Sequence, residues 1–231
     1  TSPNGTHHIA ISTADIKGQL EFFTDVLGME LVGLFVLHGV PNGRHCLLQM
    51  GEQQFAFVFM PDNKDKEIIF GHTHSGSGAG SSAPGTLQHF AFNVDSQADL
   101  LAMRDRIRSR GVPCFGPLNH GLCRSIYFAG PEGLSLEVAT SDGCADLLDS
   151  EGTWLDAEVV AEMGISDEEL QKFRNPAAYK GKNGTVAQPA YDPSKPHTQQ
   201  FSLEDYKALL TVPDDILTAD QGYEIPPGKQ G

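Results

Sequence analysis

The chain has 231 residues, of which 39% are hydrophobic and 20% charged, a mixture typical of one globular domain with or without an extension. The 30 acidic residues outnumber the 16 basic ones, and the net charge of −14 argues against nucleic acid or an anionic membrane as a partner. No apolar run approaches the length of a membrane span, and the four cysteines show no CxxC spacing, so we expect reduced thiols and a cytoplasmic protein.

The first 60 residues predict a β-α-β-β-β order. His8-Ile-Ala-Ile is an alternating strand pattern, and an amphipathic helix follows over about residues 15–27 and ends at Gly28, as a left-handed helix cap requires. Further strands are predicted over residues 30–37, 44–50 and 54–60. A connector over residues 68–85 is rich in Gly and Ser, which is typical of a lid or a disordered segment.

The same order recurs after the connector. His89-Phe-Ala-Phe repeats the opening pattern at an offset of 89 − 8 = 81 residues, and a second helix over about residues 97–110 ends at Gly111. Strands are predicted over residues 112–115, 125–129 and 134–140. The chain therefore predicts an α+β fold in which tandem βαβββ modules, over about residues 6–60 and 87–140, form a curved mixed sheet around a cleft.

Residues 141–231 carry no repeat and form a separate C-terminal extension to the domain at residues 1–140. Three short helices are predicted over about residues 155–163, 167–173 and 203–210, with capping-box spacing at Ser166 and Ser202. The rest of the extension is irregular and too poor in apolar residues to fold alone. We expect it to pack on the core or on a partner subunit.

Three residues occupy positions that a metal site would need. His8 and His89 open the two repeated strands, and Glu137 lies inside the last strand of the second module. Two imidazoles and one carboxylate on one face of a metal are typical of non-haem Fe(II) oxygenases, because the opposite face stays open for substrate and oxygen. The sequence thus predicts His8, His89 and Glu137 as metal ligands, whereas neighbouring His7 should face the other side of its strand.

The repeated modules and these three positions resemble the vicinal oxygen chelate superfamily, which includes glyoxalase I, bleomycin-resistance proteins, epimerases and type I extradiol dioxygenases. The stretch from His120 through Tyr127 and Pro131 to Glu137 is similar to the extradiol signature, although it departs from the signature at Gly130. The fourth strand of the first module lacks the carboxylate that glyoxalase I-like members generally have there. Three ligands leave the coordination sites that a bidentate diol and O₂ require.

The resemblance implies roles for three further residues. His74, fifteen residues before His89, stands where an acid/base histidine is expected, with His72 as an alternative. Tyr127 and His120 would hydrogen-bond the substrate oxygens. Each residue also has an ordinary interpretation: His74 on a solvated loop, His120 on a surface loop and Tyr127 in the core.

We therefore expect an Fe(II)-dependent extradiol dioxygenase that cleaves a catechol-type ring with O₂ and assembles as a homodimer. One alternative is a lyase, isomerase or epimerase of the same superfamily that uses Mn, Zn, Ni or Co. Another alternative is a metal-free protein that binds a small aromatic compound. The fold leaves these alternatives open because one scaffold serves several chemistries.

Overall fold

A computed structural model describes residues 2–37, 39–182, 184–217 and 226–229. It divides into two compact units, one comprising Asn4–Pro176 and the other Ala177–Gly231 together with the first three residues. Residues 141–176, the first part of the expected extension, therefore cluster with the modules. None of the helices in the described parts of the chain is long and apolar enough to cross a bilayer.

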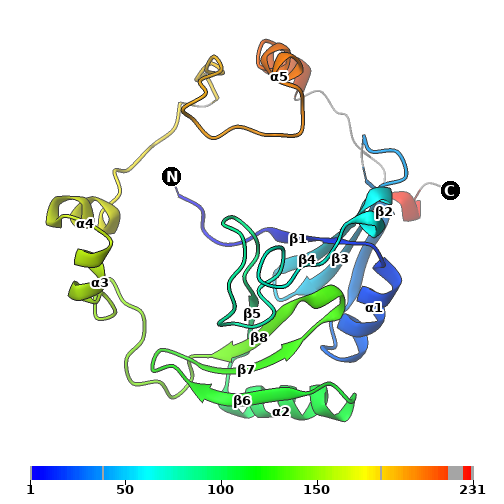
Figure 1. Ribbon diagram of the computed structural model, residues 1–231, viewed down its shortest axis with the longest axis vertical. Helices are drawn as coiled ribbons and strands as arrows, with labels where there is room; N and C mark the ends of the chain where they lie inside the picture. The colour runs from blue at the N-terminus through cyan, green and yellow to red at the C-terminus, as the bar shows by residue number, and fades with distance from the viewer. Residues whose placement is uncertain (1, 38, 183, 218–225, 230–231) are drawn as a thin grey trace. The chain divides into compact units, whose positions relative to one another are not determined.

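Each module folds as β-α-β-β-β, so the predicted α+β class and tandem organisation are confirmed (Figure 1). The first module contains β1 (His8–Thr13), α1 (Ile16–Asp25), β2 (Leu31–Val36), β3 (Arg44–Met50) and β4 (Gln53–Phe59). The second module contains β5 (Phe90–Asn93), α2 (Gln97–Ser109), β6 (Cys114–Asn119), β7 (Arg124–Ala129) and β8 (Ser135–Thr140). Short 3₁₀ turns, η1 (Pro61–Asp65) and η2 (Pro131–Gly133), follow β4 and β7.

Local signals at the helix ends match the sequence. The Asp15 side chain accepts a hydrogen bond from the Gly18 amide at the start of α1, and Ser96 does the same for Asp99 at the start of α2. The glycine that follows each helix, Gly28 or Gly111, has a positive φ, 75° and 77° respectively, which a residue with a Cβ adopts only at a cost.

The two modules form matching four-stranded mixed sheets, with strand orders β1-β4-β3-β2 and β5-β8-β7-β6. In each sheet the first strand pairs in parallel with the last strand, so that Ala10 lies opposite Ala56 and Ala91 opposite Glu137. Because Ala10 and Ala91 hold the same place in the repeated His-x-Ala motif, Ala56 is the counterpart of Glu137. The two modules therefore have the same backbone arrangement, but only the second carries a carboxylate at this position.

An aromatic core joins the modules. Phe23 of α1 stacks on Phe55 of β4 with ring centroids 5.3 Å apart, and Phe55 meets Phe90 and Phe92 of β5 at 4.9 and 5.3 Å. Phe23 and Phe55 are fully buried. Since side chains alternate along a strand, residues 54, 56 and 58 of β4 and residues 89, 91 and 93 around β5 face away from this core.

A carboxylate in the turn between β7 and β8 also links the modules. Glu132 accepts hydrogen bonds from Thr13 Oγ1 at 2.6 Å, from the Ala14 amide at 2.8 Å and from Gln19 Nε2 at 2.7 Å. Thr13 and Gln19 are buried, so these donors have little access to water. Glu132 adopts a left-handed conformation with φ of 53°, which the three hydrogen bonds stabilise.

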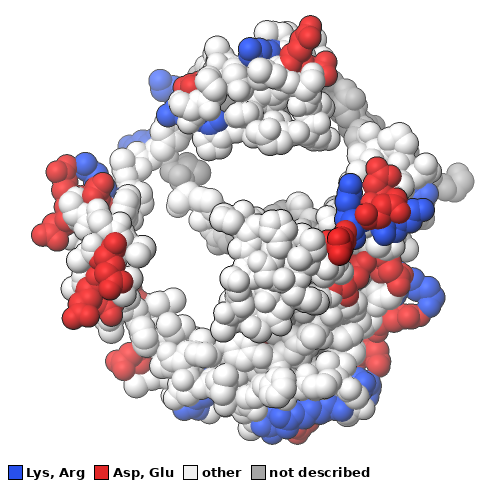
Figure 2. All heavy atoms as spheres, viewed as in Figure 1, with Lys and Arg blue, Asp and Glu red and all other residues white. Residues whose placement is uncertain are grey.

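Beyond β8 the chain forms α3 (Ala157–Glu162) and α4 (Asp167–Arg174), close to the predicted helices. A complete capping box at Ser166 and Glu169 opens α4, as its spacing predicts. Asp and Glu side chains gather on both helices (Figure 2).

The second unit contains α5 (Leu203–Leu209), α6 (Asp214–Leu217) and η3 (Pro227–Lys229), of which only α5 is predicted by the sequence. The rings of Tyr191, His197 and Tyr206 cluster with centroids 5.1–6.2 Å apart, and the Lys207 ammonium lies over Tyr191. This small cluster gives the unit packing of its own.

Candidate functional site

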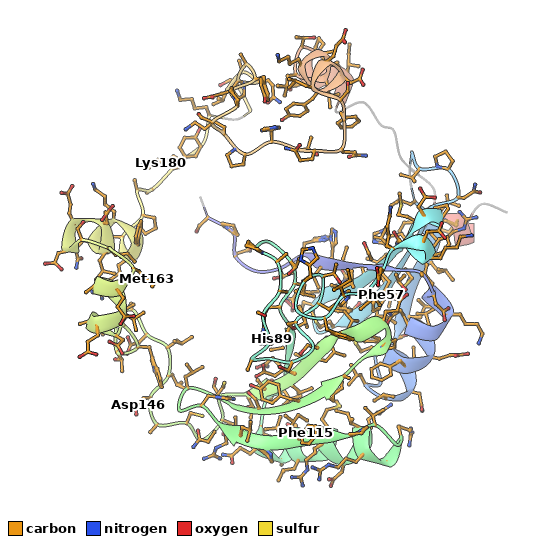
Figure 3. All side chains as sticks on the ribbon, viewed as in Figure 1. Phe57, His89, Phe115, Asp146, Met163 and Lys180 are labelled. Carbon is orange, nitrogen blue, oxygen red and sulfur yellow. The ribbon has the colours of Figure 1, made fainter. Side chains whose placement is uncertain are left out.

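Two of the three predicted ligands lie side by side. His89 stands two residues before Ala91, the strand partner of Glu137, so both side chains leave the sheet on the face away from the aromatic core. The His89 Nε2 is 3.1 Å from the Glu137 Oε2. Glu137 is only 6% exposed, whereas about a third of the His89 side chain reaches solvent. In Figure 3, His89 lies where the connector meets the second sheet.

This spacing suits a shared metal ion. Two ligand atoms at right angles, each about 2.1 Å from an ion, are about 3 Å apart. The other ring nitrogen of His89, Nδ1, contacts the side-chain oxygen of Gln88. A proton on Nδ1 that is donated to Gln88 leaves the lone pair of Nε2 free for a metal, which is the usual second hydrogen bond of a histidine ligand.

Tyr127 and His120 extend the site across β7. Tyr127 lies opposite Glu137 in the β7–β8 register, and its hydroxyl is 2.9 Å from the His120 Nε2. Burial raises the pKa of the Tyr127 phenol, the nearby Glu137 carboxylate raises it further, and a hydrogen bond with Ser125 opposes the shift. The phenol therefore remains a protonated donor beside a carboxylate. His120 is exposed on the turn that follows β6. The 2.9 Å contact brings together the histidine and the tyrosine that the sequence predicts to act on the same substrate.

The connector brings His74 to the same region. His74 and His89 line one cavity of about 340 Å³, together with Ala10 and Ser12 of β1 and Ser135 of β8. The His74 Nδ1 is 2.9 Å from the Thr73 Oγ1, which leaves Nε2 available to another partner. Of the two connector histidines, His74 lines this cavity, whereas His72 is exposed on the loop.

Hydrogen bonds within the connector give it a defined path, although its composition predicts a flexible segment. The amide of Ala83 donates to the carbonyl of His72 at 2.7 Å, and the Gln88 side chain donates to the carbonyls of Ser77 and Gly80 at 3.1 and 3.0 Å. The residue that contacts His89 therefore also fastens the loop that carries His74.

His8 lies apart from this group. It is exposed at the start of β1, where its Nδ1 is 2.9 Å from the Nδ1 of His7. Among the described residues, no group of three or more His, Cys, Asp or Glu side chains is arranged to hold a metal ion. The residues present thus fit two adjacent ligand positions, and the predicted role of His8 as the third ligand stays a prediction.

His45 is a neighbour of this region that the sequence did not single out. Its ring centroid is 6.4 Å from that of His8 and 5.4 Å from that of Phe35. The Nε2 is buried and has no hydrogen-bond partner among the described residues, and burial, followed by the nearby His8, lowers the pKa of the imidazole. Its place on a predicted strand was the only sequence signal for His45. Alternation along a strand does not tell which face of the sheet lines the cleft and which faces solvent.

Residues 5–138 match the family model described as the Glyoxalase/Bleomycin resistance protein/Dioxygenase superfamily. The chain belongs to this superfamily. The match spans both modules and includes all six predicted site residues, which are His8, His74, His89, His120, Tyr127 and Glu137.

Among curated proteins of this superfamily, the chain is similar to biphenyl-2,3-diol 1,2-dioxygenase 3 of Rhodococcus globerulus, with 24% identity over 131 residues. The aligned region is 57% of this chain and 60% of that protein, so the chain spans less than two thirds of the relative it matches.

Solved structures to which the chain is similar include lactoylglutathione lyase from Agrobacterium tumefaciens and a glyoxylase/bleomycin resistance protein/dioxygenase domain from Frankia sp. EAN1pec. The lyase is 22% identical, with 61% of this chain and 96% of that one covered and a TM-score of 0.43. The Frankia domain is 16% identical, with 62% and 95% covered and a TM-score of 0.49.

Proposed function

We propose that the protein is an Fe(II)-dependent extradiol dioxygenase that cleaves a catechol-type aromatic ring with O₂. The observation that carries the proposal is the 3.1 Å contact of His89 and Glu137 beside the hydrogen-bonded pair of Tyr127 and His120. The similarity to a biphenyl-diol dioxygenase supports the choice of substrate class. Ala56 at the position equivalent to Glu137 supports it as well, because the first module adds no second carboxylate.

In this proposal His89 and Glu137 hold the metal, with His8 as the third ligand. The bound iron would supply binding positions for both diol oxygens and for O₂, and a path for electrons between them. The ligand set must be neutral imidazole and ionised carboxylate, so metal affinity falls as the pH drops.

The surrounding residues bind and orient the diol. The protonated Tyr127 phenol donates a hydrogen bond to one diol oxygen, and His120 fixes the direction of the phenol through the 2.9 Å contact. The His74 Nε2 accepts the proton that the second hydroxyl releases, while Thr73 holds Nδ1. Thr73, His74 and Ser75 of the connector line one side of the cavity beside His89, so the proton acceptor reaches the diol from the loop.

The test is anaerobic Fe(II) loading followed by oxygen-electrode and near-UV/visible assays on a panel of catechols that includes 2,3-dihydroxybiphenyl. We expect one bound iron per chain and oxygen uptake with a yellow ring-opened product. His89→Ala and Glu137→Ala should lose both binding and turnover, and His8→Ala should do the same, while His197→Ala, in the second unit, is the control.

The acid/base assignment has its own matched pair. His74→Gln should lower kcat by about 100-fold, the usual contribution of a positioned proton acceptor, whereas His72→Gln should leave it unchanged. Stoichiometric Zn or Ni binding with no oxygen uptake on any diol would refute the dioxygenase proposal and favour a lyase, isomerase or epimerase. Absence of metal binding in the wild-type protein would favour the aromatic-binding alternative.

A further inference from the structure

The segment after β8 reaches the turn that carries His120. Trp154, the single tryptophan of the chain, lies against Gly121. A Cβ added to Gly121 would be 2.6 Å from the Cη2 of the indole, so any other residue at this position would push the indole away. Gly121 also has a φ of 85°, a left-handed conformation that favours glycine for a second reason.

The indole is held from its own side by a compact turn. Its Nε1 donates to the carbonyl of Asp146 at 3.1 Å, and the Asp149 carboxylate accepts from the amides of Gly152 and Thr153 at 2.8 and 3.2 Å. A hydrogen bond from the Thr153 hydroxyl, followed by those from the two amides, lowers the pKa of Asp149, whose side chain remains charged as a cap on the turn. The ring is therefore placed by backbone geometry, although 42% of Trp154 is exposed.

The beginning of the segment is fixed as well. Asp142 accepts a hydrogen bond from the amide of Gln97 at the start of α2, and its carbonyl accepts from the Gln97 side chain, both at 3.0 Å. The Gln97 oxygen in turn contacts Arg124 of β7. Residues 142–154 are thus anchored at one end to α2 and β7 and at the other end against the turn after β6.

Among the described residues, the backbone amides of the turn donate only to groups within the turn. The His120 amide donates to the Cys123 carbonyl at 2.9 Å, and the Gly121 amide donates to the Asn119 side chain at 2.9 Å. Both bonds, like the Asn119–Arg124 pair that closes the β6–β7 ladder, act at the base of the turn and leave the outer side of Gly121 to other contacts. The position of the His120 ring relative to Tyr127 therefore depends on what lies behind Gly121, and the indole is there.

We infer that Trp154 is a positioning residue for the proposed diol site: packed on Gly121, it holds His120 within hydrogen-bonding distance of Tyr127. The inference rests on the proposed function and assigns a role to the first part of the C-terminal extension. Trp154 acts through His120 and touches neither metal nor diol. Losing one hydrogen bond of ordinary strength changes a rate by about 5-fold.

The experiment compares Trp154→Ala, Trp154→Phe and Gly121→Ala in the full chain, with Phe173→Ala as the control, since Phe173 is a large exposed apolar residue of the same extension. Trp154→Ala should lower kcat/KM about 5-fold with unchanged iron stoichiometry, and Trp154→Phe should recover part of the loss. In a His120→Ala background, Trp154→Ala should cause no further loss. Equal losses in both backgrounds would overturn the inference, because they would show that Trp154 acts independently of His120.

A second readout needs no activity. Because Trp154 is the only tryptophan, acrylamide quenching of the protein's fluorescence reports on its contact with the turn. Gly121→Ala should increase quenching, and Trp154→Ala should shift the ring proton resonances of His120 while Phe173→Ala does not. Unchanged quenching and unchanged resonances would overturn the inference even if the protein cleaves diols. Failure of the wild type to cleave any diol would overturn the proposed function and leave these two measurements decisive for the contact.

Discussion

Removal of the Glu132 carboxylate should destabilise the whole Asn4–Pro176 unit. In Glu132→Ala, three donors lose their acceptor, and two of them belong to the buried residues Thr13 and Gln19. A hydrogen bond to a charged group contributes about 1.5 kcal/mol or more, so three would amount to roughly 4–5 kcal/mol. Since Glu132 is half-buried and water can reach part of the gap, we expect a loss of about 3 kcal/mol.

The left-handed backbone at Glu132 supplies an internal comparison. Alanine at a φ of 53° costs about 1 kcal/mol more than glycine, so Glu132→Gly should retain about 1 kcal/mol more stability than Glu132→Ala. Both variants lose the same three hydrogen bonds. The difference between them therefore isolates backbone strain from the lost acceptor.

Urea titration and thermal melting followed by circular dichroism would measure these effects. For a unit of this size, about 3 kcal/mol corresponds to a decrease in melting temperature of roughly 6–12 °C. Glu52→Ala is the matched control, because Glu52 is exposed in the corresponding β3–β4 turn of the first module. If Glu132→Ala and Glu52→Ala lose the same stability, the hydrogen bonds to Glu132 do not link the modules energetically.

Three further predictions concern other parts of the chain. The raised pKa of the buried Tyr127 phenol means that its contribution to stability is fully present below pH 10 and is lost as the pH rises through the folded-state pKa. Alkaline denaturation of the wild type should therefore be steeper than that of Tyr127→Phe, and identical pH profiles would contradict this. Burial raises the pKa of the Cys46 and Cys114 thiols, so mass spectrometry after timed iodoacetamide treatment at pH 8 should find them modified more slowly than the half-buried Cys123 and Cys144. A chain that ends at residue 176 should have the melting temperature of the Asn4–Pro176 unit in the full chain. A chain that ends at residue 145 should melt at a lower temperature because it lacks the contact of Trp154 with Gly121. Equal melting temperatures of the two truncated chains would contradict a stabilising role of that contact.

The fold was readable from the sequence because its signals are local. Apolar alternation, helix caps and the glycines after the helices specify each element, and the 81-residue repeat specifies their order twice. The largest boundary difference is at β6, predicted over residues 112–115 and found over Cys114–Asn119. An irregularity in its pairing with β7 falls between Phe115 and Leu118, and it interrupts the alternation by which a strand is recognised.

The candidate site was predictable only where strand register follows from the repeat. His89 and Glu137 meet because β5 and β8 are neighbouring parallel strands and Glu137 pairs with Ala91, two residues after His89. The repeated His-x-Ala motif implies this register. Glu132 was not predicted because its hydrogen-bond donors lie more than a hundred positions earlier in the chain. Trp154 was not predicted because its partner, Gly121, lies in a turn that has no recognisable sequence pattern. The relation of His8 to the other ligands depends on how two sheets meet, a long-range property that spacing within one module does not encode.

The aromatic core that joins the modules has a consequence for synthesis of the chain on the ribosome. The segment Gln53–Phe59, QQFAFVF, contains three phenylalanines, no charge and no proline, a composition typical of aggregation-prone strands. Phe55 is covered in part by Phe90 and Phe92, which leave the ribosome only after the connector has been made. A nascent first module therefore exposes this strand until the second module arrives, so slow translation through the connector should increase its dependence on chaperones.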